Sequence, residues 1–173
     1  MTLPDAPAKS LHMTRKPFQS SVLFVCLGNI CRSPLAEAAL RHEALQAGLE
    51  LCVDSAGTGS WHVGNPPDPR AQAEALRHDI DISTYRARQV SREDFERFDH
   101  VIALDRANYA DLERLAPRNP RARLSMLLDH VPGMEGSDVA DPYFGGPEGF
   151  EETWQEVALA ARHLVTALLG DSR

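Results

Sequence analysis

The stretch that decides the fold of this chain runs Val22-Leu23-Phe24-Val25-Cys26-Leu27-Gly28-Asn29-Ile30-Cys31-Arg32-Ser33-Pro34. Its first five residues form a continuous apolar run, which is typical of a strand buried on both faces of a parallel sheet. Good helix formers follow Pro34, and proline suits the first helical turn, where its missing N–H costs no hydrogen bond. We predict a strand, a tight loop and a helix that runs to about Ala47, with Gly48 as its stop.

The same alternation continues along the chain. We predict further strands at 51–53, 99–105 and 123–128, helices at 69–78, 106–115 and 151–169, a short helix opening at 91, and a long loop over 129–149. Strands that alternate with helices indicate a single-domain α/β fold, with a four-stranded parallel sheet covered by helices on both faces. In such sheets ligands bind beyond the carboxyl ends of the strands, so we expect the chemistry at that edge.

Composition limits the class of protein. The chain has 173 residues, a net charge of −7 and three cysteines. The acidic balance argues against nucleic acid as the main partner. No stretch approaches the roughly 20 apolar residues that cross a membrane, and the cysteine spacing does not resemble a disulfide framework. We expect a cytoplasmic monomer with no membrane partner, in which residues 1–20 form a flexible N-terminal tail and 21–173 form the domain.

A thiol and a guanidinium stand at the two ends of the predicted loop. The thiolate is the reactive form of cysteine, and a helix N-terminus and a nearby arginine, here Arg32, both favour it at Cys26. Backbone N–H groups of 27–32 can surround a tetrahedral anion, and Arg32 can bind two of its oxygens. Gly28 and Asn29 are the residue types that most readily adopt the left-handed conformations that such a loop needs.

These features indicate phosphoryl transfer through a cysteinyl phosphate, with Ser33 donating a hydrogen bond to the sulfur of Cys26. The chain has no Walker lysine and no metal-ligand cluster, so neither a cofactor nor a metal is implied. The plainer interpretation is a buried strand-end thiol and a solvated arginine, since Cys-x5-Arg often occurs by chance. The strand before the loop and the Ser-Pro helix start after it make this instance much more specific.

The loop resembles the signature of the low-molecular-weight protein-tyrosine phosphatases, and the resemblance covers roughly residues 21–169. Further landmarks in the family's order are Asp54-Ser55-Ala56-Gly57-Thr58, Trp61, Asp68-Pro69-Arg70, Ala87-Arg88-Gln89, Asp94-Phe95, Phe98-Asp99 and Asp141-Pro142-Tyr143. The resemblance implies a flavodoxin-like fold of the phosphotyrosine phosphatase I type. It also implies metal-independent hydrolysis of phosphotyrosine, in tyrosine-phosphorylated proteins, and of small aryl phosphates.

The resemblance assigns roles to single residues. Cys26, Arg32 and Asp141 would be catalytic, with Asp141 first protonating the leaving phenol and then activating water. The phosphate and the substrate ring would be bound by Leu27, Gly28, Asn29, Ile30, Cys31, Ser33, Trp61, Tyr143 and Phe144. Ser55 would support the loop through a hydrogen bond to Asn29.

Three further residues bear on these roles. The family uses a cysteine at the position of Cys31 for a reversible disulfide that protects the nucleophile. We expect Cys52 to be a small buried hydrophobe. Many animal members have a histidine where this chain has Tyr85, so the support that this histidine gives the loop does not transfer.

Two other functions remain as alternatives. An arsenate reductase of the same fold needs further cysteines downstream, and this chain has none after Cys52. A non-catalytic phosphotyrosine-binding module would be expected to lack Cys26, Arg32 or Asp141, and all three are present.

Overall fold

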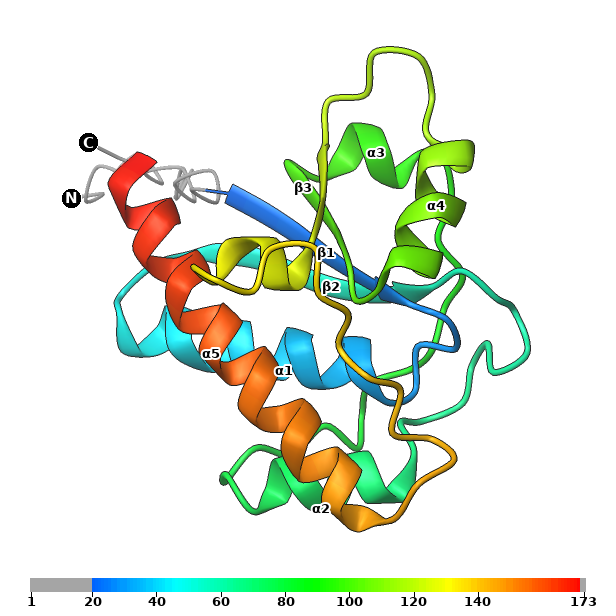
Figure 1. Ribbon diagram of the computed structural model, residues 1–173, viewed down its shortest axis with the longest axis vertical. Helices are drawn as coiled ribbons and strands as arrows, with labels where there is room; N and C mark the ends of the chain where they lie inside the picture. Colours follow the sequence, from blue (N-terminus) through cyan, green and yellow to red (C-terminus); the bar gives the residue numbers. More distant parts are fainter. Residues whose placement is uncertain (1–19, 172–173) are drawn as a thin grey trace, which may run out of the picture.

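The computed structural model describes residues 20–171, whose strands form one parallel sheet in the order β2-β1-β3-β4 (Figure 1). The strands are β1 (Ser20–Cys26), β2 (Leu51–Gly57), β3 (His100–Ala103) and β4 (Arg123–Met126). The helices are α1 (Arg32–Gln46), α2 (Pro69–Leu76), α3 (Asp94–Arg97), α4 (Arg106–Leu115) and α5 (Pro147–Asp171), with a 3₁₀ helix, η1, at Leu127–His130. The predicted α/β class and parallel sheet are confirmed.

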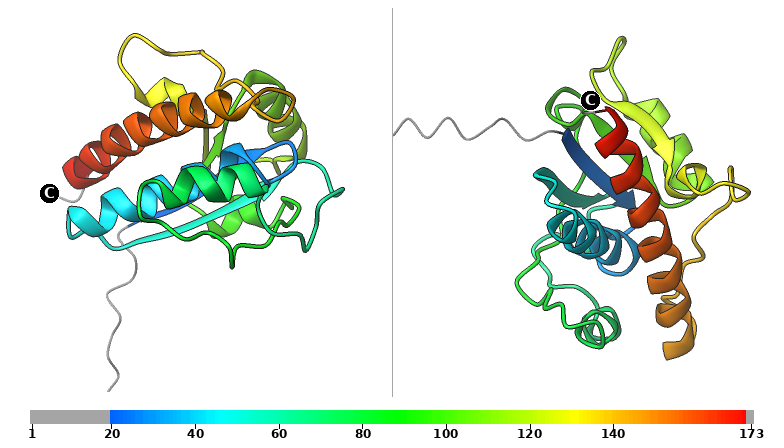
Figure 2. Two further views of the ribbon diagram at one scale, coloured as in Figure 1. Left: turned by 90° about the horizontal axis from the view of Figure 1, so that it is seen from below. Right: turned by 90° about the vertical axis from the view of Figure 1, so that its left-hand side faces the viewer.

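The central strand β1 is buried on both faces. Val22 and Phe24 belong to a hydrophobic cluster formed with α1, α2 and α5, whereas Leu23 and Val25 belong to a second cluster formed with α3 and α4. Figures 1 and 2 show α5 lying alongside α1 on the first of these faces. Because successive side chains of a strand point to opposite faces, two covered faces require an apolar residue at every position. This explains the continuous apolar run in the sequence.

Local signals in the sequence set several helix ends. Gly48 follows α1 with a φ of +67°, a left-handed conformation that glycine adopts without steric cost. Asp68 caps α2 by accepting a hydrogen bond from the Arg70 N–H at 2.8 Å, and Pro69 is the first helical residue. In α5, Trp154 is buried and stacks on His78.

The second strand is longer than predicted. β2 stays paired with β1 as far as Gly57, through residues that resemble a turn in the sequence. Its polar side chains find partners there: Asp54 accepts a hydrogen bond from Arg88, and Ser55 accepts one from Asn29. Tertiary contacts therefore override the local turn signal. In the same strand Cys52 is half-buried, not fully buried as expected.

Two other boundaries also differ. Leu127 and Leu128 belong to η1 instead of prolonging β4, because Asp129 accepts a hydrogen bond from the Met126 N–H at 3.0 Å and turns the chain. The last helix begins at Pro147, four residues before the predicted start, again with proline at the first helical position.

The first strand begins earlier than predicted. Ser20, which the sequence assigned to the tail, is the first residue of β1, and the rest of the predicted tail lies outside the described residues. Within residues 20–171, no helix combines the length and the apolar character that crossing a membrane requires.

Candidate active site

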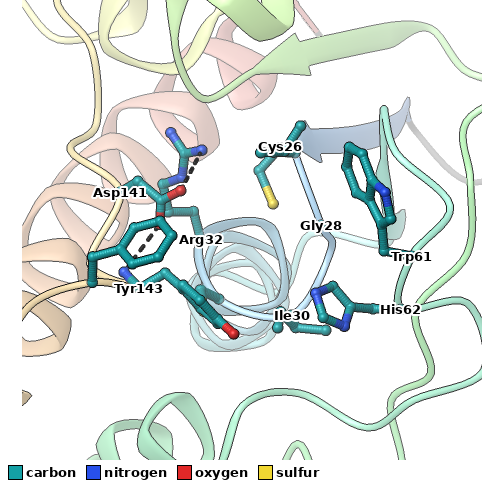
Figure 3. A pocket seen from close by; sticks show the side chains of 11 residues that line it. Cys26, Gly28, Ile30, Arg32, Trp61, His62, Asp141 and Tyr143 are labelled. Carbon is teal, nitrogen blue, oxygen red and sulfur yellow. Dashed lines mark hydrogen bonds and ion pairs between the residues drawn. The ribbon is translucent and has the colours of Figure 1, made fainter.

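Cys26 is the last residue of β1, and its side chain points into a cavity at the carboxyl edge of the sheet (Figure 3). Its sulfur lies 3.0 Å from the Ser33 hydroxyl oxygen in the first turn of α1. Asn29 Nδ2 already donates to that oxygen at 2.8 Å, and the competing acceptor, the Ala56 carbonyl, is 3.4 Å away. The Ser33 proton is therefore best directed at the sulfur, where it stabilises negative charge.

Asn29 gives the loop its shape. Its φ is +57°, in the left-handed region that asparagine tolerates better than most residues. Its amide group donates to Ser33 and, at 2.9 Å, to Ser55, while its side-chain oxygen accepts from the Arg88 N–H at 3.0 Å. Three hydrogen bonds from one buried side chain compensate for the backbone conformation and tie the loop to β2.

Gly28 does not have the left-handed conformation that we expected, since the positive φ values of the described glycines lie elsewhere. A Cβ atom at Gly28 would lie 3.1 Å from His62 Cδ2. A side chain at this position would therefore require the imidazole of His62 to shift by a few tenths of an ångström, whereas the dihedral angles of Gly28 place no demand for glycine.

Ser55 is held from behind by Glu37, a residue that the sequence analysis did not single out. The Ser55 hydroxyl donates to Glu37 Oε1 at 2.8 Å, and Arg41 Nε donates to the other oxygen of this buried carboxylate at 2.9 Å. Burial raises the pKa of Glu37. Tyr85, which stands in place of the family histidine, is half-buried nearby, and burial together with Glu37 raises its pKa to about 12. In this chain Glu37 supports Ser55, and Ser55 in turn contacts Asn29 of the loop.

Arg32 is buried at the start of α1, and its guanidinium is fixed on one side. Nη1 donates to Asp105 at 2.6 Å and to the Val139 carbonyl at 3.0 Å, and Nη2 lies 3.5 Å from Asp141 Oδ2. Asp105 also caps α4 by accepting from the Asn108 N–H at 2.7 Å. The guanidinium is oriented before any anion binds, which lowers the entropy cost of binding.

Asp141 lies on the loop before α5, and its side chain is 38% exposed at the cavity mouth. It accepts a hydrogen bond from the Tyr143 N–H at 3.1 Å. Arg70 fastens this loop to α2 by donating to the carbonyls of Tyr143 at 3.0 Å and Gly145 at 3.2 Å. Asp68 in turn holds Arg70 through two hydrogen bonds of 3.0 Å.

The cavity has a volume of about 200 Å³. Its lining residues come from three loops and are Cys26, Leu27, Gly28, Ile30, Cys31, Arg32, Trp61, His62, Asp141, Tyr143 and Phe144. In Figure 3, Arg32 and Asp141 lie on one side of the Cys26 sulfur, and Trp61 and His62 lie on the other. The arrangement combines a thiol and a buried guanidinium with apolar and aromatic side chains.

The predicted site residues fall into two groups. Most line the cavity, but Asn29, Ser33 and Ser55 lie behind the loop, where they support it instead of facing a ligand. His62 lines the cavity and was missed, although its place next to Trp61 in a Gly- and Pro-rich loop could have indicated it. Within residues 20–171, no three His, Cys, Asp or Glu side chains are grouped so as to hold a metal ion.

The second cysteine of the loop differs from Cys26 in its hydrogen bonding. Cys31 is buried, and no described side chain donates to its sulfur as Ser33 does to that of Cys26. Burial, with further contributions from Asp68 and other negative groups, raises the pKa of the Cys31 thiol. It therefore stays protonated at neutral pH.

Comparison with known proteins agrees with this geometry. The sequence model of the low molecular weight phosphotyrosine protein phosphatases matches residues 21–173. The low molecular weight phosphotyrosine protein phosphatase of Schizosaccharomyces pombe is 44% identical over 136 residues, which are 77% of this chain and 86% of the relative. YfkJ of Bacillus subtilis, a low molecular weight protein-tyrosine-phosphatase, is 43% identical over 150 residues, which are 86% of this chain and 95% of the relative.

Solved structures show the same likeness. The crystal structure of YfkJ superposes with a TM-score of 0.82 at 40% identity, covering 89% of this chain and 97% of YfkJ. The crystal structure of DARP, a Drosophila arginine phosphatase, superposes with a TM-score of 0.80 at 34% identity, covering 84% of this chain and 96% of DARP.

Proposed function

Since this chain belongs to the low molecular weight phosphotyrosine protein phosphatases, we propose that it hydrolyses phosphotyrosine in proteins through a phosphocysteine on Cys26. The observation that carries the proposal is the convergence of Cys26, Arg32 and Asp141 on one cavity. These residues lie on different segments of the chain, yet Arg32 and Asp141 approach to 3.5 Å. The pair places a phosphate-binding cation next to a proton donor.

In the first step the Cys26 thiolate attacks phosphorus, an S–P bond forms, and the P–O bond to the tyrosine breaks. Asp141 gives its proton to the departing phenolate oxygen. Arg32 and the inward N–H groups of the loop neutralise the charge on the equatorial oxygens, which is where it is spread in the transition state.

In the second step Asp141, now a carboxylate, takes a proton from water as the water attacks phosphorus. The S–P bond breaks, inorganic phosphate leaves, and the electron pair returns to the Cys26 sulfur. The Ser33 hydroxyl, 3.0 Å from that sulfur, stabilises the thiolate as leaving group.

The cavity walls support an aryl substrate. Ile30, Trp61, Tyr143 and Phe144 present apolar and aromatic surface above the anion site, and Trp61 is 71% exposed and available to stack on a ring. A phosphoarginine would present a guanidinium in this region, and Asp141 is the one carboxylate among the described lining residues. The lining therefore favours phosphotyrosine over phosphoarginine.

The arsenate reductase alternative lacks the cysteines that its relay needs after Cys52. The binding-module alternative does not explain why the acid Asp141 is held beside Arg32. We also infer that the enzyme works in the cytoplasm, because its nucleophilic cysteine must stay reduced.

Hydrolysis of p-nitrophenyl phosphate, with and without EDTA, tests the proposal. We expect metal-independent turnover that is abolished by Cys26→Ser and retained by the matched control Cys52→Ser. Acid quenching should trap a phosphate adduct on the peptide that contains Cys26. The test continues with a phosphotyrosine peptide and a phosphoarginine peptide of the same sequence. Turnover in Cys26→Ser would sink the mechanism, and faster cleavage of phosphoarginine would reassign the substrate.

A further inference from the structure

A second cavity of about 280 Å³ adjoins the phosphate cavity. Trp61 and Leu27 line both cavities, so the two meet at these side chains. We call the second cavity the Trp61–α4 groove. It lies between the loop that follows β2 and the helix α4, and no step of the proposed chemistry uses it.

The groove is apolar at its base. Leu112 of α4 is fully buried, Val90 is nearly so, and Leu115 of α4 also lines the groove. At the mouth, Leu27 is 44% exposed, although phosphate binding asks only for the backbone N–H of this residue. Exposed large apolar side chains grouped around a hollow mark an interaction site.

The indole of Trp61 forms one wall of the groove. A Cβ atom at Gly59 would lie 1.9 Å from Trp61 Cζ3, so the indole rests directly on the glycine backbone. Gly59 is itself held, since its N–H donates to the Leu27 carbonyl at 2.9 Å. Gln89 fixes the preceding residue by donating to the Thr58 carbonyl at 3.1 Å. The indole is therefore backed by hydrogen-bonded backbone.

The charge at the rim restricts the occupant. Asp111 of α4 lines the groove and is ion-paired with Arg114. A carboxylate at the rim of an apolar hollow disfavours an acidic side chain and leaves an aliphatic or aromatic one unaffected.

We propose that the Trp61–α4 groove is a subsite for an apolar side chain of the phosphoprotein substrate, within about three residues of the phosphotyrosine, since an extended peptide advances about 3.3 Å per residue. The proposal rests on the proposed function, because continuity with the phosphate cavity is what identifies the occupant. The phosphotyrosine fills one side of Trp61, the chain crosses the indole, and the apolar side chain fills the other side.

The test uses phosphotyrosine peptides in an alanine background, with one leucine or one aspartate placed in turn at each of the three positions before and after the phosphotyrosine. We expect leucine at one or two positions to raise kcat/KM about tenfold over alanine, as burial of one apolar side chain allows, and aspartate at the same positions to lower it. A flat leucine scan would overturn the proposal.

Two variants locate the effect. Leu115→Asp should remove the preference for leucine, while kcat/KM for p-nitrophenyl phosphate stays unchanged. The matched control Leu45→Asp, on an exposed residue of α1, should retain the preference. Asp111→Lys reverses a charge at the rim and leaves the apolar base of the groove unchanged. It should raise kcat/KM for the aspartate peptide. A preference for leucine that survives Leu115→Asp would contradict the subsite.

Failure of the proposed function and failure of the subsite give different results. Absence of turnover of p-nitrophenyl phosphate and of every peptide would mean that the proposed function has failed, whereas turnover with a flat scan means that only the subsite has failed. Gel filtration that shows a dimer at assay concentrations, abolished by Leu115→Asp, would make the groove a contact between copies of the chain and would overturn the proposal.

Discussion

The carboxylate of Asp105 lies 2.6 Å from Nη1 of Arg32, whose side chain is only 3% exposed. The same side chain caps α4 by accepting from the Asn108 N–H. One residue just beyond the end of β3 therefore orients the guanidinium of Arg32 and starts a helix. From the sequence we predicted no catalytic role for Asp105.

Asp105→Asn separates these two duties, because asparagine caps a helix about as well as aspartate but carries no charge. We expect KM for p-nitrophenyl phosphate and the inhibition constant of inorganic phosphate to rise about tenfold, since a charged hydrogen bond is worth about 1.5–3 kcal/mol. Asp105→Ala should cost about 1 kcal/mol more in the free energy of unfolding, because the cap is lost as well. Unchanged phosphate inhibition in Asp105→Asn would show that the ion pair does not position Arg32.

In Asp141→Asn the loss of kcat should depend on the leaving group, as expected if Asp141 is the proton donor. General acid catalysis contributes about 10²–10⁴-fold, and a poorer leaving group needs more of it. We expect a larger loss of kcat for phenyl phosphate than for p-nitrophenyl phosphate, measured on the same preparation. Equal losses of kcat for the two substrates would argue that Asp141 does not donate a proton and acts only through its ion pair with Arg32.

Arg70→Ala should act through Asp141, because Arg70 holds the carbonyls of Tyr143 and Gly145 in the loop that carries the acid. We expect kcat to fall by about tenfold or more, with the same leaving-group dependence as Asp141→Asn, since displacement of a catalytic group by about 1 Å can cost about 10²-fold. The losses in the double variant should not add. Arg77→Ala, just beyond the end of α2, is the matched control and should have normal kinetics.

Glu37→Gln should change how stability depends on pH. Burial raises the pKa of Glu37 above its ordinary value of 4.5, so the folded state binds this proton more tightly than the unfolded state. Protonated Glu37 therefore contributes to the free energy of unfolding. This contribution is complete below pH 4.5 and is lost as pH rises through the pKa of Glu37 in the folded state. Relative to wild type, the variant should therefore gain free energy of unfolding as pH rises from about 4 to about 7.

Urea denaturation across that range measures this difference. The comparison with wild type cancels His100 and His130, whose pKa values are lowered by burial and which titrate in both proteins. The exposed residue Glu50 supplies the control variant, Glu50→Gln. If the difference in free energy of unfolding between Glu37→Gln and wild type did not change with pH, the pKa of Glu37 would not be raised in the folded state.

Mild peroxide should link Cys26 to Cys31. Mass spectrometry of digested protein is expected to show this disulfide, with activity restored by dithiothreitol, because both thiols lie on one short loop and line the same cavity. Inorganic phosphate should slow the reaction by covering Cys26. In Cys31→Ser the same treatment should drive Cys26 to irreversible oxidation. A disulfide that involves Cys52 instead would refute the pairing.

Much of the fold could be predicted because its signals are local. The apolar run of β1, the helix stop at Gly48 and the cap at Asp68 each depend on residues that are near one another in sequence. The error in β2 came where distant residues decide the outcome. β2 continues to Gly57 because Asp54 and its neighbours find hydrogen-bond partners from other segments.

The site divides in the same way. By itself the sequence determined that a thiol and a guanidinium, at Cys26 and Arg32, flank a loop between a strand and a helix, because that spacing is a property of contiguous backbone. Only the tertiary structure decided that Glu37 supports Ser55, that Arg70 fastens the loop of Asp141, and that a groove opens behind Trp61. These contacts join segments that are far apart along the chain, and packing of helices on both faces of the sheet brings them together.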